Sequence, residues 1–209
     1  MRVVALGSVK GIEEFGRIRL SRTFFVRDFL YSTIAVHHGM KNLPDDPDTF
    51  VAAGQRLCEE LLEPLQDRFG RIAIRSAYRS PEVNETGQAK YGTCAANEAN
   101  YGGHIWDRRT TDGHLGATAS IVVPAYLDHY EATGEWKPLA WWIHDHLPYS
   151  DMCFFAKLCA FNISWCESPN KRIENWIDRK RLLTKPGMDN HEGSHSDAYE
   201  YVSLLRDAS

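Results

Sequence analysis

Histidine, aspartate and cysteine side chains occur in this chain at spacings that suit metal binding. His104 and Asp107 are three residues apart, close enough to share an ion where the chain curls. His144 and His146 are two residues apart, so on a strand both rings would face the same side. Cys166, as a thiolate, is a good ligand for zinc. Two ligand sets stay open: His104, Asp107 and Cys166, or His104, His144 and Cys166.

Each of these residues also has a purely structural interpretation. His104 can hydrogen-bond within the long polar segment around it, and Asp107 can pair with the arginines that follow it. Exposed ion pairs of that kind contribute little stability. His144 and His146 can be held by main-chain groups beside two tryptophans. Cys166 can be a small core residue, because free cysteines are commonly buried.

A second chemical feature is the segment 74–84, which is typical of a short strand that enters a tight polar turn. The turn presents Arg79, whose guanidinium can hold a carboxylate through two parallel hydrogen bonds. Tyr78, Ser80 and Asn84 lie in the same turn and are the accompanying candidates for substrate binding.

Two carboxylates are candidates for a general base. Glu98 lies in a segment of unknown course, and Glu167 follows an expected strand. Both can equally be solvated surface acids. His191 and His195, four residues apart in a polar tail, are interpreted as solvated side chains.

The elements that must position these residues follow from hydrophobic periodicity. An amphipathic helix is predicted over 48–69, with Pro64 dividing or kinking it. Residues 85–115 are rich in glycine, asparagine and threonine and are expected to form a long loop. Short apolar runs at 141–143 and 160–165 predict further strands.

Length and composition indicate one globular domain over residues 1–183, followed by a polar C-terminal extension, 184–209. A formal charge of -4 gives no reason to expect nucleic acid as a partner, and no apolar run suits a membrane span.

The start of the chain lacks the apolar core of a signal peptide, which predicts a cytoplasmic protein as synthesised. Five cysteines without a CxxC pair indicate free thiols in a reducing compartment. No nucleophile elbow, phosphate loop or dinucleotide fingerprint occurs.

Residues 20–84, His104 and the segment 116–124 resemble the Hedgehog/D-Ala-D-Ala zinc peptidase superfamily. The segments that carry the resemblance are Leu20–Phe25, Asn42–Pro44, Leu61–Gly70, Tyr78–Asn84 and Gly116–Pro124. The resemblance implies an α+β fold with a small central antiparallel sheet flanked by helices. It also implies a zinc-dependent D,D-carboxypeptidase or endopeptidase that acts on cell-wall (peptidoglycan) peptides.

Residue by residue, the resemblance is incomplete. His104 matches the first zinc ligand and Arg79 matches the arginine that holds a substrate carboxylate or carbonyl. Ser120 stands where the family has its zinc-binding aspartate, and Trp165 or Cys166 stands at the late histidine. A neutral hydroxyl is a poor zinc ligand, so several positions of the family's site have changed together.

Two functions therefore remain open. One is a zinc peptidase with a rearranged metal site. The other is a catalytically inactive protein, a pseudoenzyme, that binds peptide or serves as a structural component of a larger particle such as a phage. In either case a phage particle or lysis system would bring a protein without a signal peptide to the cell wall, and phage structural proteins are possible partners.

Overall fold

The computed structural model describes residues 6–200 and 202, which form two compact units. The first unit takes in the described residues up to Glu59 together with Ser76–Ala119. The second takes in Glu60–Arg75 and the described residues from Ser120 onward. The arginine turn and His104 belong to unit 1, whereas His144, His146 and Cys166 belong to unit 2.

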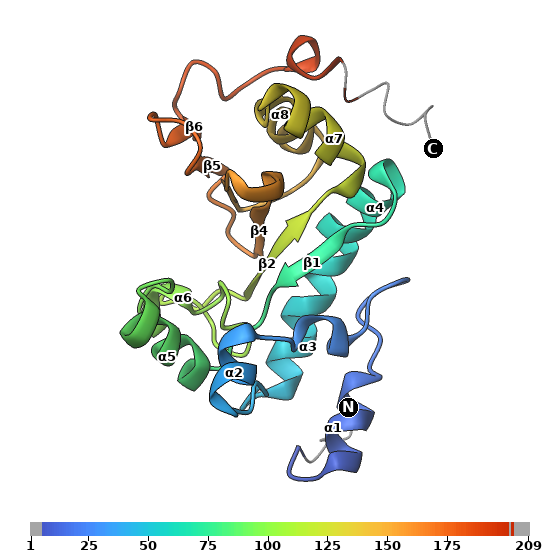
Figure 1. The fold of residues 1–209 in the computed structure, drawn as a ribbon, viewed down its shortest axis with the longest axis vertical. Helices are drawn as coiled ribbons and strands as arrows, with labels where there is room; N and C mark the ends of the chain where they lie inside the picture. The colour runs from blue at the N-terminus through green and yellow to red at the C-terminus, as the bar shows by residue number, and fades with distance from the viewer. Residues whose placement is uncertain (1–5, 201, 203–209) are drawn as a thin grey trace. The chain divides into compact units, whose positions relative to one another are not determined.

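Unit 1 is mainly helical. Its elements before the arginine turn are α1 (Val9–Gly16), η1 (Val26–Phe29), α2 (Thr33–His38) and α3 (Pro47–Leu57). A π-helical segment, η2 (Cys58–Leu62), follows α3. After the turn come α5 (Pro81–Tyr91) and α6 (Asn97–Asn100) (Figure 1).

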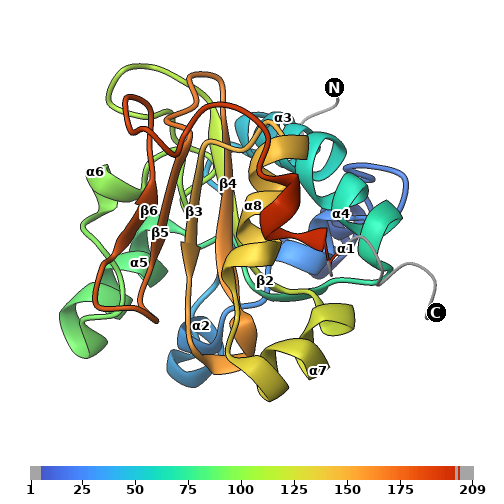
Figure 2. The ribbon, with the colours of Figure 1, turned by 90° about the horizontal axis from the view of Figure 1, so that it is seen from above.

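Unit 2 carries the larger share of the strands. Its helical elements are α4 (Glu63–Phe69), α7 (Pro124–Thr133), α8 (Lys137–His146), η3 (Lys157–Cys159) and η4 (Ser196–Ala198). The strands of the chain are β1 (Ala73–Ser76), β2 (Gly116–Val122), β3 (Asp151–Phe154), β4 (Phe161–Cys166), β5 (Arg172–Asn175) and β6 (Leu182–Thr184). Across the described residues they form a six-stranded sheet in the order β1-β2-β4-β3-β5-β6. Figure 2 shows β6, β5, β3 and β4 side by side.

The expected α+β class with a sheet flanked by helices is confirmed, but the sheet is mixed rather than antiparallel. β3 pairs antiparallel with β4 and parallel with β5, whose residues Arg172–Asn175 align with Asp151–Phe154. Parallel neighbours require a crossover, and the chain makes it through β4. The strand predicted at 160–165 is present as β4.

Pro64 divides the predicted long helix, as expected. Proline has no N–H to continue the α-helical hydrogen bonds, and the π-helical segment Cys58–Leu62 lies immediately before α4. Gly70 ends α4 with a positive φ of 74°. The helical region begins at Pro47, where Asp46 is the N-cap and accepts a hydrogen bond from the Thr49 N–H at 3.1 Å.

Two other expectations are wrong. Residues 141–143 lie inside α8 and not in a strand, because the apolar run is one face of a helix that begins at Lys137-Pro138. Residues 85–115 are not one long loop, because α5 occupies 81–91. Ser80 caps this helix through a hydrogen bond from the Val83 N–H to its hydroxyl, and Pro81 is its first residue.

An aromatic core lies at the centre of unit 1. Trp106 is fully buried, and its ring centroid lies 5.0 Å from that of Phe50 and 5.2 Å from that of Phe29. The Trp106 indole N–H donates to the carbonyl of Thr118 at 3.1 Å. Aromatic side chains of this size supply much of the apolar area buried in a small unit. The segment that carries His104 is therefore attached to the core two residues farther on.

Unit 2 has its own aromatic core between α8 and the sheet. Phe154 on β3 stacks on Phe161 on β4 with centroids 4.5 Å apart, and Trp136 at the start of α8 lies 4.9 Å from Phe154. Trp142 on α8 contacts Phe69 on α4 edge to face at 4.8 Å. These contacts fix α8, the helix that carries His144.

A tight turn at Gly102 shapes the segment around His104. Gly102 has a φ of 66°, and its N–H lies 2.8 Å from the carbonyl of Arg108. A Cβ at Gly102 would lie 2.6 Å from Cγ2 of Thr110, whereas a Cβ at Gly113, which also has positive φ, would meet nothing within 4 Å.

These two glycines give a matched pair for mutation. Gly113→Ala should lower the free energy of unfolding by about 1–2 kcal/mol, the usual cost of left-handed backbone for an L-residue. Gly102→Ala should cost about 2–4 kcal/mol, because steric overlap with Thr110 is added. Urea-induced unfolding of both variants measures the difference, and equal losses would contradict the tight packing at Gly102.

Candidate functional site

The structure divides the predicted site residues between the two units. Unit 1 contains Tyr78, Arg79, Ser80, Asn84, Glu98, His104 and Asp107, and unit 2 contains His144, His146, Cys166 and Glu167. Both ligand sets predicted from the sequence therefore take members from each unit.

The main chain of the arginine turn is fixed by hydrogen bonds on both sides of Arg79. The Arg79 N–H donates to the carbonyl of His104 at 2.8 Å. The Asn42 side chain donates to the carbonyl of Tyr78 at 2.9 Å and accepts from the Ser80 N–H at 2.8 Å. Asn42 is buried, and its amide satisfies a donor and an acceptor of the turn at once. This role of Asn42 was not predicted from the sequence.

The guanidinium of Arg79 has no anionic partner among the described residues. Its Nη1 donates to Sγ of Cys94 at 3.2 Å, and its Nε is shielded from solvent without a hydrogen-bond partner. Among the residues that the structure describes, no carboxylate forms an ion pair with it. Burial lowers the pKa of Arg79, since the charged form is poorly solvated. Cys94 was not among the predicted site residues, because its contact with Arg79 spans 15 residues of sequence.

Ser80 and Asn84 use their polar atoms within the protein. Ser80 caps α5 through the Val83 N–H at 3.3 Å. The Asn84 amide donates to the carbonyl of Ala95 and to Oδ1 of Asn97, both at 2.9 Å. These bonds attach α5 to the chain that follows it.

Asp107 is a buried carboxylate, not a surface acid, and only 2% of the residue is exposed. It accepts hydrogen bonds from the Asp45 N–H at 2.8 Å and the Tyr78 hydroxyl at 3.1 Å, and Arg108 lies 3.4 Å away. Burial raises the pKa of Asp107, and these donors partly offset the effect. Tyr78 is itself fully buried, which raises its pKa, with the Asp107 charge adding to the rise.

His104 is buried in a defined tautomer. Its Nδ1 lies 2.7 Å from the carbonyl of Ala77. A carbonyl only accepts, so Nδ1 carries the proton and Nε2 keeps a lone pair in the neutral ring. Burial, with the nearby charge of Arg79, lowers the pKa of His104 to about 3.

These residues do not fit the zinc site of the resembled superfamily. His104 has the tautomer that a metal ligand needs, but the carboxylate of Asp107 is already bound by several donors, and Ser120 supplies only a hydroxyl. Within the described part of the chain, no group of three potential ligand atoms that are close enough for one ion includes His104 or Asp107.

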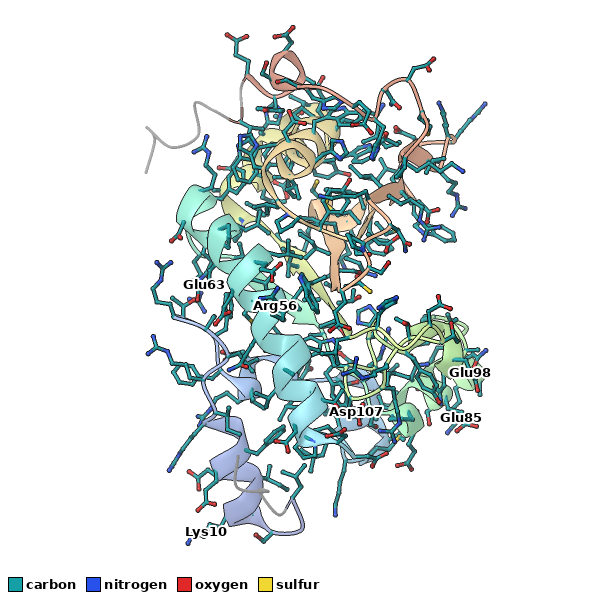
Figure 3. The ribbon with its side chains drawn as sticks, turned by 180° about the vertical axis from the view of Figure 1, so that it is seen from behind. Lys10, Arg56, Glu63, Glu85, Glu98 and Asp107 are labelled. Atoms are coloured by element: carbon teal, nitrogen blue, oxygen red, sulfur yellow. The ribbon has the colours of Figure 1, made fainter. Side chains whose placement is uncertain are left out.

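The two candidate bases are exposed, and Cys166 is half-buried. Glu98 is exposed in α6, and Figure 3 shows it at the outer edge of the α5–α6 region, with Asp107 nearer α3. Cys166 ends β4 and is half-buried, and Glu167 follows it as an exposed residue. All five cysteines are free thiols, as expected.

In unit 2, the predicted pairing of His144 with His146 is wrong, because both lie on α8. Residues two apart on a helix point about 200° away from each other. His146 is exposed and bonds through Nδ1 to the carbonyl of Trp142 in its own helix, at 2.7 Å. In His144, by contrast, Nδ1 lies 2.6 Å from the hydroxyl oxygen of Tyr149.

His195 is not solvated as expected, because its ring packs on α8. It stacks on Trp141 with centroids 4.0 Å apart and an interplanar angle of 5°. Its Nδ1 and its main-chain N–H each lie 2.7 Å from a carboxylate oxygen of Asp145. Burial alone would raise the pKa of Asp145, but hydrogen bonds from His195 and from the Tyr199 hydroxyl lower it overall. Asp145 and His195 were not predicted as a pair, since 50 residues separate them.

Comparison with known proteins gives no relative: no family model, curated protein or solved structure matches this chain. None of the described helices is long and apolar enough to cross a membrane. The resemblance seen in the sequence therefore stays a prediction.

The buried tautomer of His104 predicts a specific pH dependence of stability. Its pKa is about 3 in the folded chain and about 6.5 when unfolded, so the unfolded state binds more protons between these values. Stability from this residue is thus complete above about pH 6.5 and declines as pH falls toward 3, by about 2 kcal/mol at pH 5.

His104→Asn removes the titration and keeps an amide nitrogen at the position of Nδ1. Between pH 7 and pH 5, wild type should therefore lose about 2 kcal/mol more unfolding free energy than this variant. Urea-induced unfolding at each pH measures the unfolding free energy of wild type and variant. If both lose the same amount between pH 7 and pH 5, protonation of His104 does not destabilise the folded state, and the prediction is wrong.

Proposed function

We propose that this chain binds the free C-terminal carboxylate of a peptide through Arg79. The observation that carries the proposal is the shielded Nε of Arg79, which has no partner among the described residues. Nη1 of the same guanidinium donates to the thiol of Cys94, which is a weak acceptor.

A carboxylate is the ligand that would satisfy this arginine. A shielded donor without a partner costs about 1–3 kcal/mol, and an arginine–carboxylate pair recovers this through charge-assisted hydrogen bonds. The side chain is half-buried, so part of it remains accessible. Hydrogen bonds from Asn42 and to His104 fix the turn in advance, which reduces the entropy lost on binding.

The class of peptide comes from the sequence resemblance alone. The arginine in the same turn of the Hedgehog/D-Ala-D-Ala zinc peptidase superfamily holds a cell-wall peptide, so a peptide that ends in D-Ala-D-Ala is the first ligand to test. The changed positions Ser120 and Cys166 favour binding without cleavage, as in a pseudoenzyme. A role in a phage particle would be compatible with such binding.

A zinc-dependent peptidase is the second candidate, and one observation favours it. Nδ1 of His104 donates its proton to the carbonyl of Ala77, so Nε2 keeps its lone pair. Histidines that bind a metal through one ring nitrogen usually hold the other in such a hydrogen bond. The absence of further suitable ligands near His104 in the described chain ranks this candidate second.

Calorimetric titration with an acetylated peptide ending in D-Ala-D-Ala tests the first candidate. Replacing its terminal carboxylate with a carboxamide should weaken binding about 10- to 100-fold, since a charge-assisted hydrogen bond contributes about 1.5–3 kcal/mol. Arg79→Gln should weaken binding of the acid by a similar factor and leave binding of the amide almost unchanged. Equal affinities for acid and amide would contradict the proposal.

Arg75→Gln is the matched control, because Arg75 carries the same charge but is exposed on β1. It should bind the acid as wild type does. The same samples, incubated with zinc, are assayed for released D-alanine, and we expect the peptide to stay intact. Release that disappears in His104→Asn would instead establish the second candidate.

A further inference from the structure

A group of potential metal ligands lies in unit 2, apart from the arginine turn. One ring nitrogen each of His144 and His195 and a carboxylate oxygen of Asp145 all lie within 4.8 Å of one another. Among the described residues, this is the group of three such side chains that is close enough for one ion. Two of its members are adjacent on α8, and the third comes from the segment 188–199, which runs back beside α8 (Figures 1 and 2).

Each histidine of the group is held through its Nε2 by a main-chain carbonyl. Nε2 of His144 lies 2.8 Å from the carbonyl of His191, and Nε2 of His195 lies 3.0 Å from that of Asn190. Both nitrogens must carry protons there, because a carbonyl only accepts. Histidines that bind metals characteristically donate their second N–H to such a group, which fixes the ring and its tautomer.

The other ring nitrogen of each histidine faces polar side chains of the same region. Nδ1 of His195 lies 2.7 Å from Oδ1 of Asp145, and Nδ1 of His144 lies 2.6 Å from the hydroxyl of Tyr149. An ion bound between these side chains would take the place of the contact between Nδ1 of His195 and Oδ1 of Asp145.

Two further contacts orient the ligands. Trp141 stacks on the ring of His195 at 4.0 Å, and the Tyr199 hydroxyl donates to Oδ2 of Asp145 at 3.0 Å. Supporting hydrogen bonds of this kind raise metal affinity because the ligands lose little freedom on binding. Ligand atoms of a tetrahedral zinc ion lie about 3.3 Å apart, so the side chains of this group would have to adjust their separations on binding.

We propose that His144, Asp145 and His195 bind one divalent transition-metal ion of the zinc class. Two imidazoles and a carboxylate suit zinc, and they leave one coordination position for water. The ion links the segment 188–199 to α8, because His195 belongs to that segment and the other ligands to the helix. All three ligands belong to unit 2, so the proposal does not rest on peptide binding at Arg79.

Zinc titration of the full chain tests the proposal, with protein purified without a metal-binding tag, stripped with a chelator and freed of it. Wild type should take up about one zinc per chain, measured by elemental mass spectrometry, and Co²⁺ should give the visible absorption of a tetrahedral site. His195→Ala and Asp145→Asn should each weaken binding at least about 10-fold. Less than a tenth of an ion per wild-type chain after loading would overturn the proposal.

Three control variants distinguish zinc held by these ligands from zinc bound elsewhere and from a loss of packing. His146→Ala removes an exposed histidine of the same helix, and His104→Asn removes the histidine of unit 1. Both should bind zinc as wild type does. Tyr199→Phe removes a hydrogen bond to Asp145 but no ligand, so it should keep the one-to-one stoichiometry. Loss of zinc in Tyr199→Phe equal to that in His195→Ala would show that only the packing of the segment matters, and loss in His104→Asn would place the ion elsewhere.

Discussion

The buried carboxylate of Asp107 is the interaction on which unit 1 depends. An ionised carboxylate loses several kcal/mol of hydration on burial unless donors replace the water. Here the donors come from separate parts of the sequence: the main chain at Asp45, the Tyr78 hydroxyl and the neighbouring Arg108. Because no one segment supplies them all, the charge is satisfied only when the chain before α3, the arginine turn and the segment of Trp106 are together.

Unit 2 uses a carboxylate in a comparable way, with a different consequence. Asp145 on α8 receives hydrogen bonds from the ring and main chain of His195 and from Tyr199. Those donors all lie in one segment near the C-terminal end of the described chain. That segment is attached to α8 by these polar contacts, by the stack of His195 on Trp141 and by further ring contacts of His191 and Tyr199. Polar contacts that exchange protons respond to pH and to cations, whereas an aromatic core does not.

What the sequence could predict depended on how local the signal was. The division of the helix at Pro64 and the turn at Arg79 follow from residues next to them, and both are present in the structure. The run 141–143 was misassigned because a short apolar run does not distinguish a strand from a buried helix face. The pairing of Asp145 with His195 spans 50 residues, and no local pattern encodes such a contact.

The two proposed ligand sites differ in whether their polar side chains already have hydrogen-bond partners. Arg79 is a half-buried cation whose Nε has no partner among the described residues, so the folded chain is left with a cost that the proposed carboxylate ligand would remove. The side chains of His144, Asp145 and His195 have hydrogen-bond partners already, so the proposed metal ion would have to replace some of those hydrogen bonds. The proposed peptide binding at the arginine turn would therefore have a driving force in the free protein. The proposed metal binding on α8 depends instead on whether an ion binds these ligands more strongly than their present hydrogen-bond partners do.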